Sequence, residues 1–450
     1  MWLEGSGVAP GELANLAPRL QDARLAVLGG DVAPRHATPP AEAHTLTRLL
    51  ELPEQLLDDY VDHREHSQLG RILQTARRLQ PVVDRVLVLG SCDWWLGARV
   101  LMDACCEPYF NELSRSQRGP RPRLYFLDNP LDNDAARGLL ALLTEGRSPR
   151  RLEDRWALIA IGGADASVET AVAFRLFLDA LRQFCGERDL AERVVPITGP
   201  RGWLWAACGA IGCRDRHTLQ PVAEYRGFSA FSAAGLLPAA ILGLDVVRLL
   251  EGASQMNDHF RTAAPGANAV LDFAGVAHLV AQKCGAAPRI LQVWARSLES
   301  VGRWYDQLLA ASHGTSAQAV TPVTALPADD QGGYPVRRAG MLTDVVVDQW
   351  RCDPWPVGPV PRGPSVLNGV AGSTLPELMA KATDGIVEIH RQGGQPAGRI
   401  RLPRVDEWTV GQLLQMLMLA TVIEGILHAS VRFDNQARSI FAIDKGERPT

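Results

Sequence analysis

Residues 156–161, Trp156-Ala-Leu-Ile-Ala-Ile161, decide the fold class because they form an uninterrupted apolar run of strand length that ends at Gly162-Gly163. Such a run is typical of a strand that is buried on both faces of a parallel sheet. The segment that follows places apolar residues at the spacing of one helical face, at Phe174, Phe177, Leu178, Leu181 and Phe184. A buried strand followed by such a segment predicts a helix that covers a parallel sheet.

The same alternation of apolar runs and amphipathic segments extends along the chain. Further strands are predicted at Val86-Leu-Val-Leu89, Leu124-Tyr-Phe-Leu127 and Val194-Val-Pro-Ile-Thr198, and the pattern starts again at Ile290-Leu-Gln-Val-Trp294. The predicted fold class is therefore α/β, with two doubly wound domains. We expect four consecutive parts: a helical wrap over 1–83, a first α/β domain over 84–255, a second over 256–400 and a C-terminal helical segment over 401–450.

Composition and charge exclude several classes of protein. The 450 residues carry 46 Lys and Arg against 50 Asp and Glu, and 46% of them are hydrophobic. This composition describes a globular chain without the basic stripe that nucleic acid requires. The longest charge-free stretch, Gly227 to Leu244, contains a proline and three glycines, so it predicts a buried core helix and no membrane span. The segment from Val410 to His428 is apolar almost all round and predicts a second buried helix.

The cysteines give no sign of a disulfide framework. Eight cysteines are dispersed along the chain and the N-terminus has no apolar run, which predicts a cytoplasmic location. Cys208, Cys213 and His217 have nearly the spacing of zinc ligands, but no second pair of such residues follows. We favour buried structural thiols and expect no metal and no cofactor.

Two loops follow predicted strands at positions where open α/β sheets bind ligands. The first is Gly90-Ser-Cys-Asp-Trp-Trp-Leu-Gly97, and the second is Gly162-Gly-Ala-Asp-Ala-Ser-Val-Glu-Thr170. In the second loop, Ser167 is placed either to offer its hydroxyl to a ligand or to cap the helix that begins there. The spacing does not decide between these roles.

The segment Phe228–Asp245 contains Ser232-Ala-Ala-Gly-Leu-Leu-Pro-Ala-Ala-Ile-Leu-Gly-Leu-Asp245, which resembles the long internal signature of the phosphoglucose isomerase (glucose-6-phosphate isomerase) family nearly residue for residue. The order of the other elements agrees with this family from about residue 46 to 445. The resemblance implies two sugar-isomerase (SIS) type domains, a sugar phosphate or related small anion as ligand, and a homodimer. It also implies the interconversion of glucose 6-phosphate and fructose 6-phosphate, a step of glycolysis and gluconeogenesis, without a metal or cofactor.

The isomerase reaction needs a carboxylate base, an acid that opens the sugar ring and a cation that supports the developing oxyanion. Alignment with the family motifs implies that the binding residues include Ser91, Ser167, Glu169, Thr170 and Gln307.

Most catalytic positions of the family are substituted in this chain. In Gln307-Leu-Leu-Ala-Ala311-Ser312-His313-Gly314-Thr315, the family glutamate is replaced by Ala311. The family histidine position falls on Gly332 and the lysine position near Ala442. Loss of a general base alone typically costs about 10²- to 10⁴-fold in rate.

Three residues are candidate replacements for the missing groups. His313 could act as the base, although a capping histidine at the end of a helix is the favoured alternative. Arg226 is displaced by one residue from the family arginine, and Lys445 lies three residues after the lysine position. Two hypotheses remain: an intramolecular oxidoreductase (aldose-ketose isomerase) that works with replacement groups, or a pseudoenzyme that binds sugar phosphates or has a structural or regulatory role. The number of substitutions favours lost or altered activity.

Overall fold

The computed structural model describes residues 7–29, 40–163, 167–219, 227–284, 288–313, 321–326, 340–358, 369–394 and 396–428. These residues form two compact units. The described residues of unit 1 fall within Met1–Glu51, Asp103–Cys105 and Val247–Phe433, and those of unit 2 within Leu52–Met102 and Cys106–Val246. Apart from Asp103–Cys105, which belong to unit 1, the chain thus passes from unit 1 to unit 2 within α2 (Pro40–His63) and returns within α10 (Val246–Thr262). The four linear domains of the sequence analysis remain a prediction.

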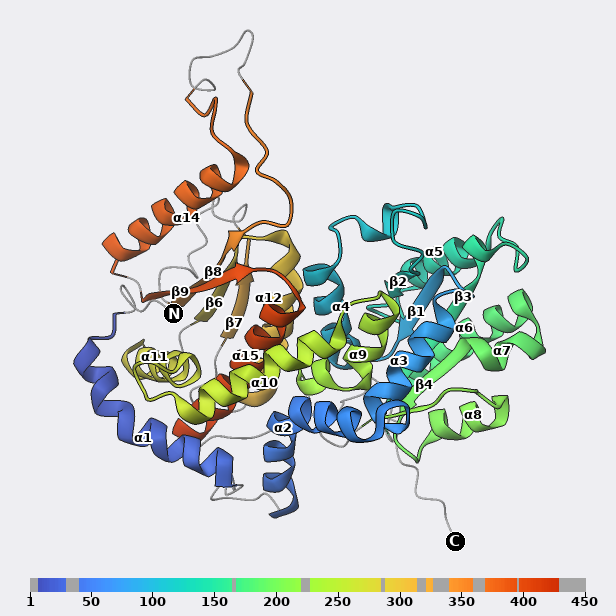
Figure 1. The fold of residues 1–450 in the computed structure, drawn as a ribbon, viewed down its shortest axis with the longest axis horizontal. Coiled ribbons are helices and arrows are strands. Elements are labelled where there is room, and N and C mark those ends of the chain that lie inside the picture. Colours follow the sequence, from blue (N-terminus) through green and yellow to red (C-terminus); the bar gives the residue numbers. More distant parts are fainter. Residues whose placement is uncertain are drawn as a thin grey trace. The chain divides into compact units, whose positions relative to one another are not determined.

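Unit 2 contains a parallel sheet with the strand order β2-β1-β3-β4-β5 (Figure 1). Its strands are β1 (Arg85–Leu89), β2 (Arg123–Phe126), β3 (Trp156–Gly162), β4 (Val194–Thr198) and β5 (His217–Thr218). Its helices are α3 (Gln68–Leu79), α4 (Cys92–Cys105), α5 (Asn133–Thr144), α6 (Val168–Cys185), α7 (Glu187–Arg193), α8 (Trp203–Ile211) and α9 (Ala233–Ile241). Short 3-10 helices are η1 (Arg64–His66), η2 (Phe110–Glu112), η3 (Leu152–Asp154) and η5 (Phe228–Phe231). The prediction of a doubly wound α/β fold is confirmed.

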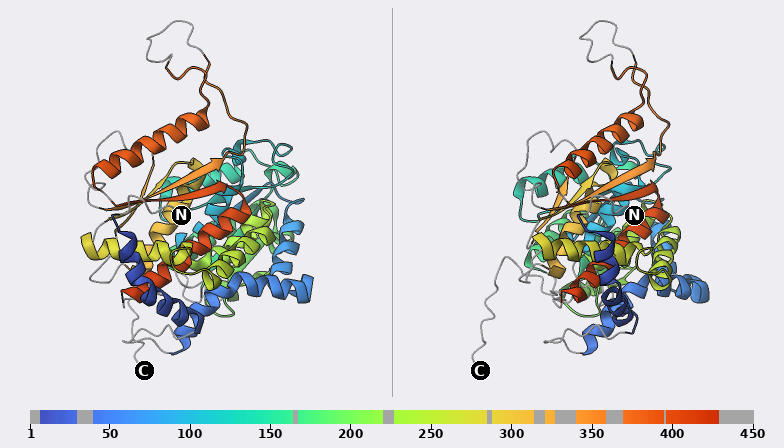
Figure 2. Two further views of the ribbon diagram at one scale, coloured as in Figure 1. Left: turned by 60° about the vertical axis from the view of Figure 1, so that its left-hand side comes forward. Right: turned by 90° about the vertical axis from the view of Figure 1, so that its left-hand side faces the viewer.

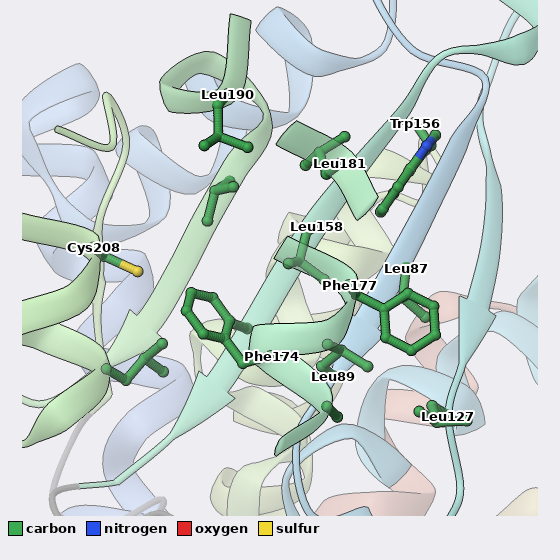
Figure 3. Close-up of a cluster of buried hydrophobic side chains, with 14 of the residues drawn as sticks. Leu87, Leu89, Leu127, Trp156, Leu158, Phe174, Phe177, Leu181, Leu190 and Cys208 are labelled. Carbon is green, nitrogen blue, oxygen red and sulfur yellow. The ribbon is translucent and has the colours of Figure 1, made fainter. Parts of the chain in front are cut away.

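The strands of this sheet are apolar throughout because they are covered on both faces. Every residue of β1, β3 and β4 is buried. On one face, the apolar stripe of α6 packs against the sheet, and Figure 3 shows Phe174 and Phe177 lying over Leu158 of β3. The helical face predicted from the spacing of these phenylalanines is therefore the face that contacts the sheet.

A buried cluster of charged side chains stabilises the amino-terminal edge of the same sheet. The carboxylate of Asp84, immediately before β1, is fully buried. It accepts hydrogen bonds from Arg115 and Arg118, each at 2.8 Å, and forms an ion pair with Arg123. The remaining donors of these arginines bond to backbone carbonyl groups, including that of Leu113. The cluster ties the connection between α4 and β2 to the sheet.

Unit 1 contains a second parallel sheet with the order β7-β6-β8-β9. Its strands are β6 (Pro288–Val293), β7 (Thr321–Ala325), β8 (Met341–Gln349) and β9 (Ala397–Arg404), so the last strand extends beyond residue 400. Its helices are α1 (Pro10–Gly29), α10, α11 (Ala269–Cys284), α12 (Glu299–His313), α14 (Leu375–Gln392) and α15 (Glu407–Leu427), with the short η6 (Arg296–Leu298). Figure 2 shows α14 on one side of β8 and β9 and α15 on the other.

The helix α15 forms the centre of unit 1. Among the described residues, it alone is long and apolar enough to span a membrane, and 89% of its apolar window is buried inside the protein. It carries the buried carboxylate of Glu424, which bonds to both terminal nitrogens of Arg289 on β6 at 2.5 Å. As the sequence predicts, α15 is a buried helix.

Candidate functional site

The candidate site of unit 2 lies at the carboxyl ends of β1 and β3. These strands are neighbours, with Leu89 opposite Ala160, and the strand order reverses between them. Ligands of open α/β sheets bind at such a reversal. The two loops begin side by side, because a Cβ atom at Gly90, the first residue after β1, would lie 2.8 Å from the carbonyl oxygen of Ile161 near the end of β3. The two loops named in the sequence analysis therefore meet at one place.

The loop after β1 is largely filled by its own side chains. Ser91 precedes α4 without capping it, and its Oγ donates a hydrogen bond to Asp93 Oδ2 at 3.3 Å. Trp95 is buried, and its Nε1 donates to the carbonyl oxygen of Gly90 at 3.1 Å while its ring lies against Phe126. The carboxylate of Asp93 and the indole of Trp95 thus occupy the first turn of α4, whose N-terminus could otherwise bind an anion.

The loop after β3 begins α6 with a capped and acidic first turn. Ser167 is the N-cap, and its Oγ accepts a hydrogen bond from the backbone N–H of Thr170 at 3.3 Å. The hydroxyls of the two residues are 3.2 Å apart. Glu169 is buried in the same turn. Ser167 therefore caps the helix, one of its two predicted roles, and a carboxylate lies at the positive end of the helix dipole.

The signature segment is a packing element of unit 2. The residues of η5 and α9 are all buried, which confirms the predicted core segment. The segment contacts α4 closely, because a Cβ atom at Gly97 would lie 2.7 Å from Ala230 Cα. Ser229 Oγ donates to the carbonyl oxygens of Asp93 and Trp94 at 3.0 and 3.1 Å. The segment thereby fixes the backbone of the loop that holds Ser91.

In unit 1, the candidate residues lie on the last turns of α12. Gln307 and Ala311 are half-buried, and the hydroxyl of the buried Ser312 has no partner within the described part of the chain. His313 ends the helix, and its side chain lies outside the described residues. Because α12 connects two parallel strands, these turns lie toward the amino-terminal edge of their sheet. The side chain of Ala311 is a methyl group, which can neither donate nor accept a proton.

Four further positions of the sequence analysis lie outside the described residues. These are Arg226, Gly332, Ala442 and Lys445. The site residues that the structure does describe fall into two groups, one in each unit: Ser91, Ser167, Glu169 and Thr170 in unit 2, and Gln307 in unit 1.

Both cysteines of the Cys208–Cys213 pair are buried, as the sequence predicts. Cys208 and Cys213 are buried at the end of α8, where the backbone N–H of Cys213 donates to the carbonyl oxygen of Cys208 at 3.1 Å. The hydrogen bond between the two thiols, together with burial, raises the pKa of Cys208, whereas the same bond lowers the pKa of Cys213. Nε2 of His217 lies 3.0 Å from Thr75 Oγ1. Within the described ranges, no group of three His, Cys, Asp or Glu side chains could hold a metal ion.

One polar turn at the same edge of the sheet was not predicted from the sequence. Thr198 ends β4 beside Gly162 of β3, and it is followed by Gly199-Pro-Arg-Gly202, which leads into α8. Its side chain is buried, and Oγ1 has no partner in the part of the chain that the structure describes. A hydroxyl residue followed by glycines and an arginine at the end of a predicted strand is the signal that could have identified this turn.

Several known proteins with similar sequences are glucose-6-phosphate isomerases. The glucose-6-phosphate isomerase of Pediococcus pentosaceus is 24% identical over 379 residues, which cover 82% of this chain and 81% of that protein. The glucose-6-phosphate isomerase of Streptococcus pyogenes serotype M3 is 25% identical over 403 residues, covering 86% of this chain and 85% of that protein. The chain is thus similar to glucose-6-phosphate isomerases over more than four fifths of its length, at about a quarter sequence identity. No family model matches it.

Solved structures show the same fold. A glucose-6-phosphate isomerase from Chlamydia trachomatis superposes with a TM-score of 0.64 at 14% identity, covering 94% of this chain and 81% of that one. A hypothetical protein from Thermus thermophilus superposes with a TM-score of 0.79 at 24% identity, covering 96% of this chain and 95% of that one. The chain therefore has the same α/β fold as these two proteins.

Proposed function

We propose that the protein binds a sugar phosphate and has lost or altered the aldose-ketose isomerase activity that gives the family its name. The observation that carries this proposal is Ala311 on α12, where resemblance to the family places the glutamate that moves the proton between C2 and C1. An alanine cannot accept a proton. The substituted histidine and lysine positions, at Gly332 and Ala442, add to the same conclusion.

The packing of unit 2 is consistent with a chain that retains its fold after losing isomerase activity. The signature segment is buried and holds the loop after β1 in place, so these packing contacts do not require a carboxylate at residue 311. Catalytic groups that act as a unit lose most of their effect when one is removed. We therefore expect turnover far below the roughly 10 s⁻¹ of an ordinary enzyme.

A coupled assay tests this proposal directly. Purified protein is mixed with fructose 6-phosphate, and formation of glucose 6-phosphate is followed. Turnover within about a hundredfold of an ordinary enzyme contradicts the proposal. In that case Lys445→Ala identifies the replacement group by a loss of activity, and Lys381→Ala, on α14, removes a lysine of the same charge as the control.

The alternative is a structural or regulatory protein on the same fold that binds no sugar phosphate. A ligand that binds the folded state raises the melting temperature with its concentration. Stabilisation by fructose 6-phosphate therefore supports the binding protein, and no shift up to millimolar concentrations supports the alternative.

The resemblance extends to assembly and location. We include in the proposal a homodimer in the cytoplasm, without nucleic acid or membrane as partners. Light scattering coupled to size exclusion measures the mass of the assembly, against 48.9 kDa for one chain.

A further inference from the structure

The turn between β4 and α8 lies beside the loop after β3. Gly162, the last residue of β3, is the register partner of Thr198, the last residue of β4. The ring of Trp203, in the first turn of α8, lies 5.5 Å from the ring of Phe174 on α6. The N-termini of α6 and α8 therefore lie at the same edge of the sheet, which is the edge where this fold binds ligands.

The side chain of Thr198 lies at this edge, on the face of the sheet that α6 and α8 cover. Side chains alternate along a strand, so Thr198 points to the same face as Val194. Val194 packs in one cluster with Leu204 of α8 and Phe174 of α6. The side chain of Thr198 is 1% exposed, and Oγ1 has no hydrogen-bond partner within the described residues. A buried hydroxyl is destabilising unless it is bonded, so Oγ1 requires a partner that this part of the chain does not supply.

The N-terminus of α8 is better suited to bind an anion than the N-terminus of α6. Gly202 is the N-cap of α8 with φ +98°, and no side chain caps the helix. Arg201 is exposed in the same turn and makes no ion pair within the described part of the protein. The first turn of α8 contains no acidic residue, whereas that of α6 contains Glu169. A helix N-terminus attracts anions, and a carboxylate in its first turn opposes them.

We propose that the turn after β4 binds the phosphate group of the ligand, through the guanidinium of Arg201, the hydroxyl of Thr198 and the N–H groups at the start of α8. The phosphate site thus lies one loop away from Gly162–Thr170, where the family lysine position holds Gly163. This inference rests on the proposed function for the identity of the ligand, but the site itself requires only a phosphate.

The first test removes the arginine. Binding of inorganic phosphate and of fructose 6-phosphate is measured by calorimetry for the wild type and for Arg201→Gln. A hydrogen bond to a charged group accounts for about a tenfold change in Kd or more, so we expect at least this loss for both probes. Arg188→Gln is the matched control, because Arg188 is an exposed arginine of the same unit on α7, which begins at the opposite end of α6. The control should bind as the wild type does.

The second test separates a ligand contact from a structural role. Thr198→Val keeps the shape of the side chain and removes the hydroxyl. Because the hydroxyl has no partner in the described chain, the ligand-free variant should melt about 2 °C higher or more, while its Kd for phosphate rises by about tenfold. A hydroxyl with a structural role would give a lower melting temperature instead, and that result overturns its assignment as a ligand contact.

The outcomes distinguish this inference from the proposed function. If the wild type binds fructose 6-phosphate and neither variant weakens it, the inference is wrong and the proposed function stands. If inorganic phosphate binds in a manner that depends on Arg201 but fructose 6-phosphate does not bind, the site stands and the proposed ligand is wrong. If neither probe binds, the inference is overturned.

Discussion

The buried imidazole of His217 makes the stability of unit 2 depend on pH. His217 is 4% exposed, and its Nε2 lies 3.0 Å from Thr75 Oγ1 on α3. Burial lowers the pKa of His217 from 6.5 to about 4, and Asp215 opposes this effect only in part. The physical cause is that the charged imidazole would lose its hydration in the core.

The direction of the effect follows from proton binding. Below pH 6.5 the unfolded imidazole takes up a proton, whereas the folded one stays neutral until about pH 4. The unfolded state binds more protons in this range, so the free energy of unfolding falls as the pH is lowered from about 6.5 to 4. One pKa unit corresponds to about 1.4 kcal/mol, so the total loss through His217 is about 3 kcal/mol.

Urea unfolding of the wild type and of His217→Gln tests this magnitude. A glutamine can still bond to Thr75 but takes up no proton, so we expect the variant to lose about 2 kcal/mol less than the wild type between about pH 7 and 5. The exposed His66→Gln is the control and should follow the wild type. His278, whose pKa burial also lowers to about 4, is present in all three proteins and cancels in the comparison. An equal pH dependence for the wild type and His217→Gln would refute the reasoning.

Two further predictions concern packing. Glu424→Gln leaves the buried guanidinium of Arg289 without its carboxylate, so we expect the free energy of unfolding in urea to fall by about 3 to 5 kcal/mol. The double variant Arg289→Met with Glu424→Leu removes both charges and should restore most of this free energy. Gly97→Ala places a methyl group 2.7 Å from Ala230 Cα and should lower the free energy of unfolding by about 1 to 3 kcal/mol. The control Gly138→Ala on α5, where nothing lies within 4 Å of the new atom, should raise it by about 0.4 to 1 kcal/mol.

These two predictions fail in different ways. A double variant as unstable as Glu424→Gln would mean that the charged pair, and not the unpaired charge, contributes the stability. Equal effects of the two glycine substitutions would mean that the signature segment adjusts to α4 without cost.

The strands of unit 2 could be predicted from the sequence because each one is locally apolar. The predicted run Val194–Thr198 coincides with β4, and Trp156–Ile161 is one residue shorter than β3. The charged contacts could not be predicted in this way. Asp84 finds its arginine partners between 31 and 39 residues away, and a separation of this length leaves no periodicity in the sequence.

The sequence predicted only those parts of the candidate site that contain a recognisable motif. The loops after β1 and β3 were identified through glycines and through resemblance to the family, and the structure brings them together. The role of Ser167 as a cap depends on the 3.3 Å contact with Thr170, which spacing alone does not establish. The turn after β4 escaped notice because Thr198 looks like an ordinary strand residue until its missing hydrogen bond is known.

The two sheets repeat one strand order, with the second strand outside the first and the third and fourth on the other side. Each sheet therefore has its own point at which the strand order reverses, and its own backbone hydrogen bonds hold the strands on either side of that point. A substitution in the loops at one reversal point leaves the backbone hydrogen bonds of the other sheet in place. A chain of this architecture can lose an ancestral reaction and remain available for new ligand specificities, because its foldability does not depend on its chemistry.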